Sequence, residues 1–234
     1  MSLLIIFTLF FAACKKKPPV NIPDDPVDKD QSPIVMKVTG KTIYVSPTGK
    51  KDNKGTQANP MELYSAIQTL VAGDTMIMLD GVYPLSTRIR ILKEQSGNYA
   101  SYITVKAENA NKVEIDFSKM LFNGNNRGIQ LDADYWYFYG INIKGAGDNG
   151  MYIGGNYNIV EMCMFYQNRD TGLQLGRSDG SFTNIKDWPH NNLIKNCTSF
   201  DNYDDETYGE NADGFAAKLT TGEEIGRASC RERV

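Results

Sequence analysis

The sequence predicts an all-β fold, a right-handed parallel β-helix with a short N-terminal capping α-helix. Gly-Ile-Gln-Leu begins at Gly128, Gly-Met-Tyr-Ile at Gly150 and Gly-Leu-Gln-Leu at Gly172, each 22 residues after the last. Each glycine opens a run in which apolar and polar residues alternate, which is typical of a strand with one buried face. A spacing of about 22 residues suits one solenoid coil with three short strands and three turns. The 21 glycines fit an architecture with many turns.

The repeat continues beyond Gly172 with two insertions. Apolar strand segments recur at Ile159 and Leu193, so this coil is 12 residues longer than a 22-residue coil. A further 8 residues enter before Gly214, the next glycine in register. Insertions in a solenoid form loops, and such loops often build the binding face. The second insertion contains six acidic residues: Asp201, Asp204, Asp205, Glu206, Glu210 and Asp213.

The folded part is expected to begin with a strand at Lys41 to Ser46, followed by one helix. Asn59 suits the helix N-cap, Pro60 its first position and Glu62 its third. An apolar stripe and a stop at Gly73 complete the helix signal, and a helix there can cover the exposed end of the solenoid. The stripe consists of Leu63, Ala66, Ile67 and Leu70. Residues 75–79 and 102–106 then read as strands of the first coils.

Two internal cysteines occupy the same register of neighbouring coils. Cys163 and Cys197 align with Ile141, so all three side chains should point inward and stack about 4.8 Å apart. Buried cysteine behaves as a small apolar residue, which favours a reduced ladder. A disulfide is the alternative, because export permits one.

The N-terminus predicts export. Residues 1–13 read as a signal peptide, since the apolar run from Leu3 to Ala13 is too short for the roughly 20 residues that span a bilayer. Cys14 after Ala12-Ala13 resembles a bacterial lipobox, which implies lipidation of Cys14 and an outer-membrane lipoprotein facing the periplasm or the cell surface. An ordinary secretory signal with an incidental cysteine is the alternative. Residues 14–40 then form a Pro-rich, charged tether.

The C-terminus departs from the repeat. Residues 224–234 (EIGRASCRERV) have no strand pattern and resemble the translation of a sequencing adapter. We therefore expect a β-helix domain at 41–223 that is interrupted, followed by a non-native tail in which Cys230 has no role. A natural basic tail is the alternative, and the encoding nucleotides decide between the two.

The chain carries a net charge of −3 and shows no basic, aromatic-laced patch. This balance gives no support for binding to nucleic acid. We expect a monomer that meets the membrane only through its lipid anchor.

Short motifs resemble known families. Tyr44-Val-Ser-Pro-Thr-Gly and Asp80-Gly-Val-Tyr are similar to the opening of secreted, carbohydrate-active β-helix proteins. Asn196-Cys-Thr-Ser-Phe-Asp-Asn-Tyr-Asp and Glu210-Asn-Ala-Asp-Gly-Phe-Ala-Ala-Lys-Leu resemble polysaccharide lyase family nine, the pectate lyase L type. The resemblance implies Ca²⁺-assisted β-elimination on an acidic plant polysaccharide, either pectin, polygalacturonate or rhamnogalacturonan. It also implies that Asp213 is a calcium ligand.

In that family the remaining calcium aspartates lie one coil later and the catalytic Lys further on. This sequence contains neither segment. The resemblance therefore implies that the catalytic residue is outside this chain and that the chain alone has little or no lyase activity.

The residues themselves rank the candidate site. Asp213 follows the acidic loop at the start of a strand, so its carboxylate should emerge at a sheet edge; an Asp before Gly is often only a turn residue. Asp201, Asp204, Asp205, Glu206 and Glu210 are weaker metal candidates, because an acidic loop is usually a solvated surface. Lys218 and Arg177 are candidates for substrate binding, with Lys186 and Arg169 as weaker ones. His190 reads as structural, and Trp188 or Tyr203 suits stacking on a sugar ring or burial against the coil.

Two other classes of function stay open at this point. A β-helix glycoside hydrolase or epimerase would act on similar polymers with saturated products, and an inverting hydrolase needs two carboxylates about 6.5–9.5 Å apart. A non-catalytic glycan-binding protein or adhesin would bind polymer without calcium.

Overall fold

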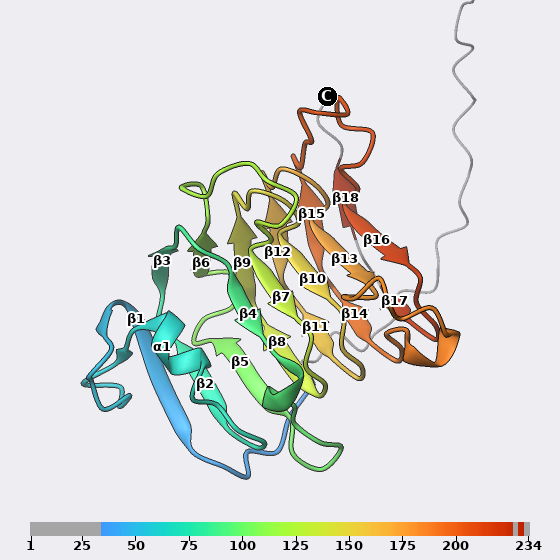
Figure 1. Cartoon of the computed structure of the whole chain (residues 1–234). Coiled ribbons are helices and arrows are strands. Elements are labelled where there is room, and N and C mark those ends of the chain that lie inside the picture. Colours follow the sequence, from blue (N-terminus) through green and yellow to red (C-terminus); the bar gives the residue numbers. More distant parts are fainter. Residues whose placement is uncertain (1–33, 227–228, 232–234) are drawn as a thin grey trace, which may run out of the picture. The chain divides into compact units, whose positions relative to one another are not determined.

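The computed structural model describes residues 34–226 and 229–231, whose strands stack into three sheets (Figure 1). The seven-stranded sheet has the order β1 (Thr42–Lys50), β2 (Thr75–Met78), β5 (Ile103–Ala107), β8 (Trp136–Tyr139), β11 (Ile159–Glu161), β14 (Leu193–Lys195) and β17 (Glu224–Gly226). The six-stranded sheet runs β3 (Gly81–Pro84), β6 (Val113–Asp116), β9 (Ile141–Lys144), β12 (Met164–Tyr166), β15 (Thr198–Phe200) and β18 (Ser229–Arg231). The five-stranded sheet runs β4 (Ile89–Ile91), β7 (Ile129–Leu131), β10 (Met151–Ile153), β13 (Leu173–Gly176) and β16 (Phe215–Lys218).

The chain visits these sheets in rotation. From β2 onward, each coil contributes one strand to the seven-stranded, then the six-stranded, then the five-stranded sheet. Neighbouring strands pair in parallel, as β7, β10 and β13 do. The architecture is a parallel β-helix, so the predicted fold is confirmed.

The glycine column confirms the 22-residue register. Met151 pairs with Ile129 on one side and Leu173 on the other, which aligns the glycines before them. A Cβ atom at Gly128 would lie 2.5 Å from the Gly150 carbonyl oxygen, and one at Gly150 would lie 2.6 Å from that of Gly172. Only glycine allows successive coils to approach this closely.

The core lies between the three sheets and consists of inward-facing apolar columns. One column of the six-stranded sheet contains Val113, Ile141, Cys163 and Cys197, all at most 1% exposed. Both thiols are free and buried, which confirms the reduced ladder.

Asparagine side chains join the coils at two turns. In one ladder the Asn158 Oδ1 atom accepts from the Trp136 amide, and the Asn192 Oδ1 atom accepts from the Asn158 amide, both at 2.9 Å. A second ladder repeats this pattern at Asn168 and Asn202. These bonds satisfy backbone groups that a buried turn would otherwise leave unpaired.

The one α-helix, α1 (Leu63–Ile67), is shorter than predicted and capped differently. Glu62 is the N-cap, and its carboxylate accepts from the amides of Tyr64 and Ser65 at 3.1 and 3.0 Å. The predicted cap at Asn59 is wrong, because Asn59 closes a turn with Thr56 before the helix begins.

The helix nevertheless covers the end of the solenoid, where it lies against β1 (Figure 1). The Gln68 side chain after it donates to the Arg90 carbonyl of the edge strand β4 at 3.2 Å. The inward-facing residues of α1 are buried: Leu63, Ala66 and Ile67. Two 3₁₀ turns, η1 (Lys93–Gln95) and η2 (Ile185–Asp187), complete the described helical segments. No helix in this part of the chain is long and apolar enough to span a bilayer.

Several predictions concern the ends of the chain. The signal peptide, Cys14 and most of the tether lie outside the described residues and remain predictions. The prediction that no strand follows Glu223 is wrong, because β17 pairs with β14 and β18 pairs with β15. A sheet edge offers unpaired N–H and C=O groups that a following segment can use whatever its side-chain pattern. The non-native origin of residues 224–234 stays a prediction.

Candidate functional site

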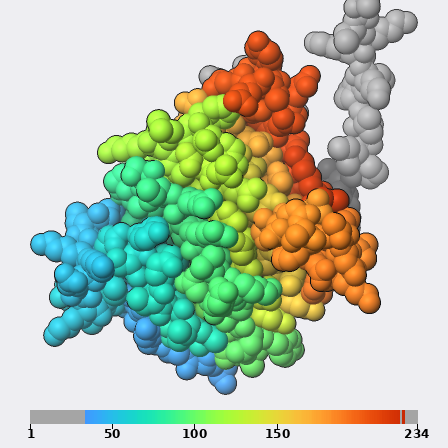
Figure 2. All heavy atoms as spheres, in the orientation of Figure 1, coloured from blue at the N-terminus to red at the C-terminus, as the bar shows by residue number. Residues whose placement is uncertain are grey.

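Both predicted insertions form loops. The first, residues 177–192, follows β13 and contains η2. Figure 2 shows it in orange, standing out from the molecular surface. The second, residues 201–214, connects β15 to β16 and carries the acidic residues.

Asp213 lies at the amino edge of the five-stranded sheet. It immediately precedes Gly214 and β16, and its side chain is exposed. Its carbonyl accepts from the Gly172 amide at 2.9 Å, which holds its backbone against the preceding coil. The structure thus places the Asp213 carboxylate at a sheet edge, as the sequence predicted.

The other acids of the loop have different environments. Asp204 is buried and accepts from the Glu206 amide at 2.8 Å and the Thr207 hydroxyl at 2.6 Å. These hydrogen bonds, led by that of Thr207, hold the pKa of Asp204 below its ordinary value. Asp204 therefore shapes the loop. The remaining four acids are exposed: Asp201, Asp205, Glu206 and Glu210.

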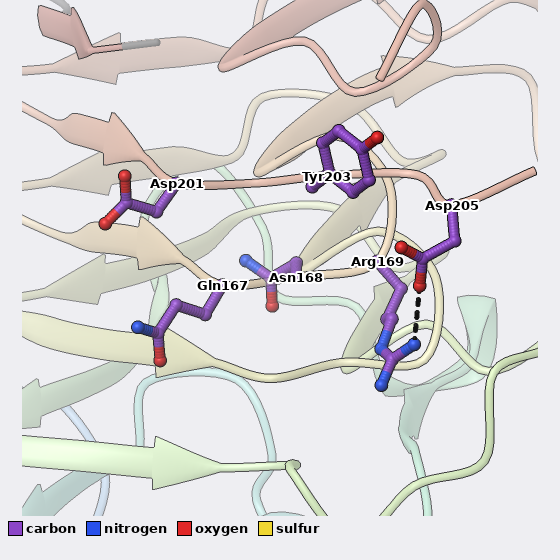
Figure 3. Close-up of a pocket in the computed structure, with 6 residues that line it drawn as sticks. All are labelled: Gln167, Asn168, Arg169, Asp201, Tyr203 and Asp205. Atoms are coloured by element: carbon purple, nitrogen blue, oxygen red, sulfur yellow. Dashed lines mark hydrogen bonds and ion pairs between the residues drawn. The ribbon is translucent and has the colours of Figure 1, made fainter. Parts of the chain in front are cut away.

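Two of these acids line a hollow of about 380 Å³ at the turn after β12 and β15 (Figure 3). Arg169 and Asp205, which lie side by side in its lining, form an ion pair with 2.9 Å between Nη1 and Oδ2. Since both side chains are at least half exposed, this pair contributes little to stability. The hollow is lined by Gln167, Asn168, Arg169, Asp201, Tyr203 and Asp205.

The acidic loop does not by itself form a calcium site. Calcium takes six to eight oxygen ligands, usually from several carboxylates and carbonyls. Within residues 34–226 and 229–231, no three His, Cys, Asp or Glu side chains come together as a metal-binding group. Asp213 can supply one carboxylate, so the described residues fit a calcium site only in part.

The two substrate-binding candidates lie at the opposite edge of the sheet. Lys218 ends β16 and pairs in register with Gly176, which Arg177 directly follows. Five residues of extended chain separate Lys218 from Asp213, a distance of roughly 17 Å. Lys218 and Arg177 therefore lie at the same edge of the sheet, and Asp213 lies at the other.

The first insertion loop forms one wall of a groove at this carboxyl edge, with a volume of about 510 Å³. Lys186 and Arg90 both line it. Arg90 is paired with Asp132 at 3.6 Å, and further acids line the same groove.

The aromatic candidates pack on the protein. His190 meets the Tyr157 ring edge-on at 5.1 Å and continues a column in which Tyr157 stacks on Tyr135 at 4.9 Å. The Trp188 indole donates to the Phe182 carbonyl at 3.0 Å. These contacts agree with the structural role predicted for His190.

Sequence reasoning missed a charged cluster at the amino edge. Asp148 is buried, and burial together with the charge of Asp170 raises the pKa of Asp148 to about 7. Arg127 opposes this shift from 3.5 Å, and its guanidinium lies over the Tyr152 ring. The signal was available: Asp148 and Asp170 each lie two residues before a glycine of the repeat.

Known proteins resemble this chain in sequence. Residues 43–232 match the family model described as "Pel9A-like, right handed beta helix region". Pectate lyase L of Thermoclostridium stercorarium is 44% identical over 185 residues, which cover 78% of this chain and 14% of that protein. Pectate lyase L of Paenibacillus polymyxa is 44% identical over 180 residues, which cover 77% of this chain and 40% of that protein. The chain spans less than half the length of these curated relatives.

A solved structure agrees with the sequence matches. The crystal structure of pectate lyase Pel9A superposes with a TM-score of 0.67 at 27% identity, covering 78% of this chain and 46% of that one. The family-model match at residues 43–232 extends over the coils that carry the glycine repeat and both insertions.

Proposed function

Since this chain belongs to the Pel9A-like right-handed β-helix family, we propose that the complete gene product cleaves pectate-type polymers by β-elimination. The observation that carries the proposal is the 44% identity to two pectate lyases L. The family-model match confirms the family expected from the motifs at Asn196 and Glu210, and the right-handed β-helix expected from the glycine repeat. The substrate class we propose is an acidic pectic polysaccharide.

The chemistry follows from the polymer. The proton at C5 of a uronate lies next to a carboxylate, and the glycosidic oxygen leaves from C4. A base takes the C5 proton, the C4–O bond breaks, a double bond forms between C4 and C5, and the departing oxygen takes up a proton to become a hydroxyl. The enzyme must stabilise the negative charge that develops on the carboxylate side. No water enters the products, which are unsaturated.

Calcium is the cofactor that we propose, with Asp213 as one ligand. Bound to the sugar carboxylate, a divalent cation supplies Lewis-acid stabilisation of that charge. The support is the position of Asp213 in the family motif and its exposed place at the sheet edge. Further ligands and the base would come from segments that this sequence does not contain, so no step is assigned to the described residues.

The test is a calcium titration of polygalacturonate cleavage by the complete gene product and its Asp213→Ala variant. Loss of a metal ligand should lower the rate at subsaturating calcium by at least about 100-fold. Unsaturated product is followed by its ultraviolet absorbance. Asp52→Ala is the matched control, because Asp52 is an exposed acid in the turn after β1, outside both insertion loops, and should leave the rate within about twofold.

The products also separate the other classes of function. Saturated oligosaccharides would show that the protein is a hydrolase and not a lyase. The protein would instead be a glycan-binding protein if it bound polymer without calcium and without cleavage, equally in the parent and in Asp213→Ala.

A further inference from the structure

The outer face of the five-stranded sheet carries an arginine whose hydrogen-bond donors the protein does not use. Arg127 directly precedes Gly128, so it takes the place in its coil that Asp213 takes three coils later. Its side chain is 23% exposed. Among the described residues no group accepts a hydrogen bond from this guanidinium, and its Nε atom is buried without one. A guanidinium has five N–H donors, and leaving them unused while partly buried is costly.

The guanidinium is nevertheless held in one orientation. Its Cζ atom lies 3.5 Å from the centroid of the Tyr152 ring, a cation–π contact. Tyr152 is itself fixed: it is 5% exposed, and its hydroxyl donates to the Arg177 carbonyl at 2.8 Å. Gly176 makes room for it, since a Cβ atom there would lie 2.8 Å from the Tyr152 hydroxyl. A rigid aromatic support therefore presents a planar cation at the sheet surface.

Only one edge of the guanidinium has a protein partner. Asp148 Oδ2 lies 3.5 Å from Arg127 Nε, which is an ion pair without a hydrogen bond. The opposite edge, formed by the two terminal nitrogens, has no described partner. Paired N–H groups in this fork match the two oxygens of a carboxylate.

We propose that the terminal edge of Arg127 binds the carboxylate of an acidic sugar residue, in a binding site supported by Tyr152. The proposal rests on the proposed function, because the ligand is a unit of the same polymer. Three strand spacings separate Arg127 from Asp213 along one edge, a distance of roughly 14 Å. A polymer lying along the solenoid axis can therefore contact both residues.

Charge alone does not account for this site. Asp148 lies close to Arg127, and Asp170 interacts with Asp148, so these acids reduce the attraction of the cluster for anions at a distance. Recognition then depends on the planar pair of donors at short range. Lysine, which carries the same charge without the fork, should not replace Arg127.

The experiment measures binding of a de-esterified oligogalacturonate and of its methyl ester to the 234-residue chain by calorimetry. A chelator is present, so any contribution of calcium is removed. The parent should bind the acid more tightly than the ester by about 10- to 100-fold, the range of a charge-assisted hydrogen-bonded pair. Arg127→Gln and Arg127→Lys should both lose that preference. Lys112→Gln, an exposed lysine before the six-stranded sheet, is the charge-matched control and should keep it.

Three results would overturn the site. They are equal binding of acid and ester by the parent, an unchanged preference in Arg127→Gln, and an equal loss for both ligands in that variant. Arg127→Lys retains a cation beside Asp148, so it is the variant expected to disturb the fold least. Thermal melting of both variants checks that they are folded. Unsaturated product from the complete gene product, together with any of these results, would reject the Arg127 site alone. Arg127-dependent binding without unsaturated product would reject the lyase alone.

Discussion

Asp148 shows how one residue reflects the stacking of coils. The fold buries its carboxyl group beside Asp170 of the next coil, and burial is the largest cause of its raised pKa. The Arg127 ion pair acts in the opposite direction but does not outweigh the other two effects. At neutral pH this carboxyl group is therefore close to half protonated.

This shift makes stability depend on pH. Because the folded pKa of about 7 lies above the ordinary value, the folded state binds the proton more tightly than the unfolded chain. The contribution to stability is complete below about pH 4 and is lost as pH rises through 7. Asp148→Asn should therefore flatten the fall in unfolding free energy between about pH 4 and 7, measured by urea denaturation at several pH values. Asp205→Asn, at an exposed ion pair, is the control and should leave the slope as in the parent. An unchanged slope in Asp148→Asn would contradict this assignment.

At the level of secondary-structure elements, the positions of several strands follow directly from the glycine repeat. Gly128, Gly150 and Gly172 predicted β7, β10 and β13 because an alternating apolar run follows each glycine. The structure adds that each of these glycines lets the neighbouring coil approach closely. The helix cap was harder to predict. Asn59 and Glu62 both suit an N-cap, and the choice depended on the turn that Asn59 closes with Thr56. The sequence also contained a signal for the asparagine ladder, since Asn158 and Asn192 each directly precede a strand of neighbouring coils.

A pair of glycine substitutions tests the close approach of coils. Gly150→Ala should lower the unfolding free energy by roughly 1–3 kcal/mol, because the new Cβ atom would meet both the Gly172 carbonyl oxygen and Asn168 Nδ2 at 2.6 Å. Gly124→Ala is the matched control, since nothing lies within 4 Å of a Cβ atom there. Chemical denaturation measures both. Equal stability of the two variants would show that the coils do not stack in this register.

The whole molecule separates its charged candidates by edge. Asp213 and Arg127 lie along the amino edge of the five-stranded sheet, and Lys218 and Arg177 lie at its carboxyl edge. The sequence correctly assigned the insertions to loops, because coil length is visible in the spacing of repeats. It could not show which of the acids are used in hydrogen bonds within the loop. Asp204 is held by the hydroxyl of Thr207, a contact that depends on how the loop closes.

Hydrogen–deuterium exchange with and without an oligogalacturonate tests most directly whether the amino edge of the five-stranded sheet contacts the polymer. The stacking of coils predicts slower exchange in four segments at that edge, residues 126–129, 148–151, 170–173 and 212–215, since a bound chain excludes water from them together. The carboxyl-edge groove around Arg90 and Lys186 serves as the internal comparison and should change less. Slowing confined to that groove, or spread over the six-stranded sheet, would contradict the central claim.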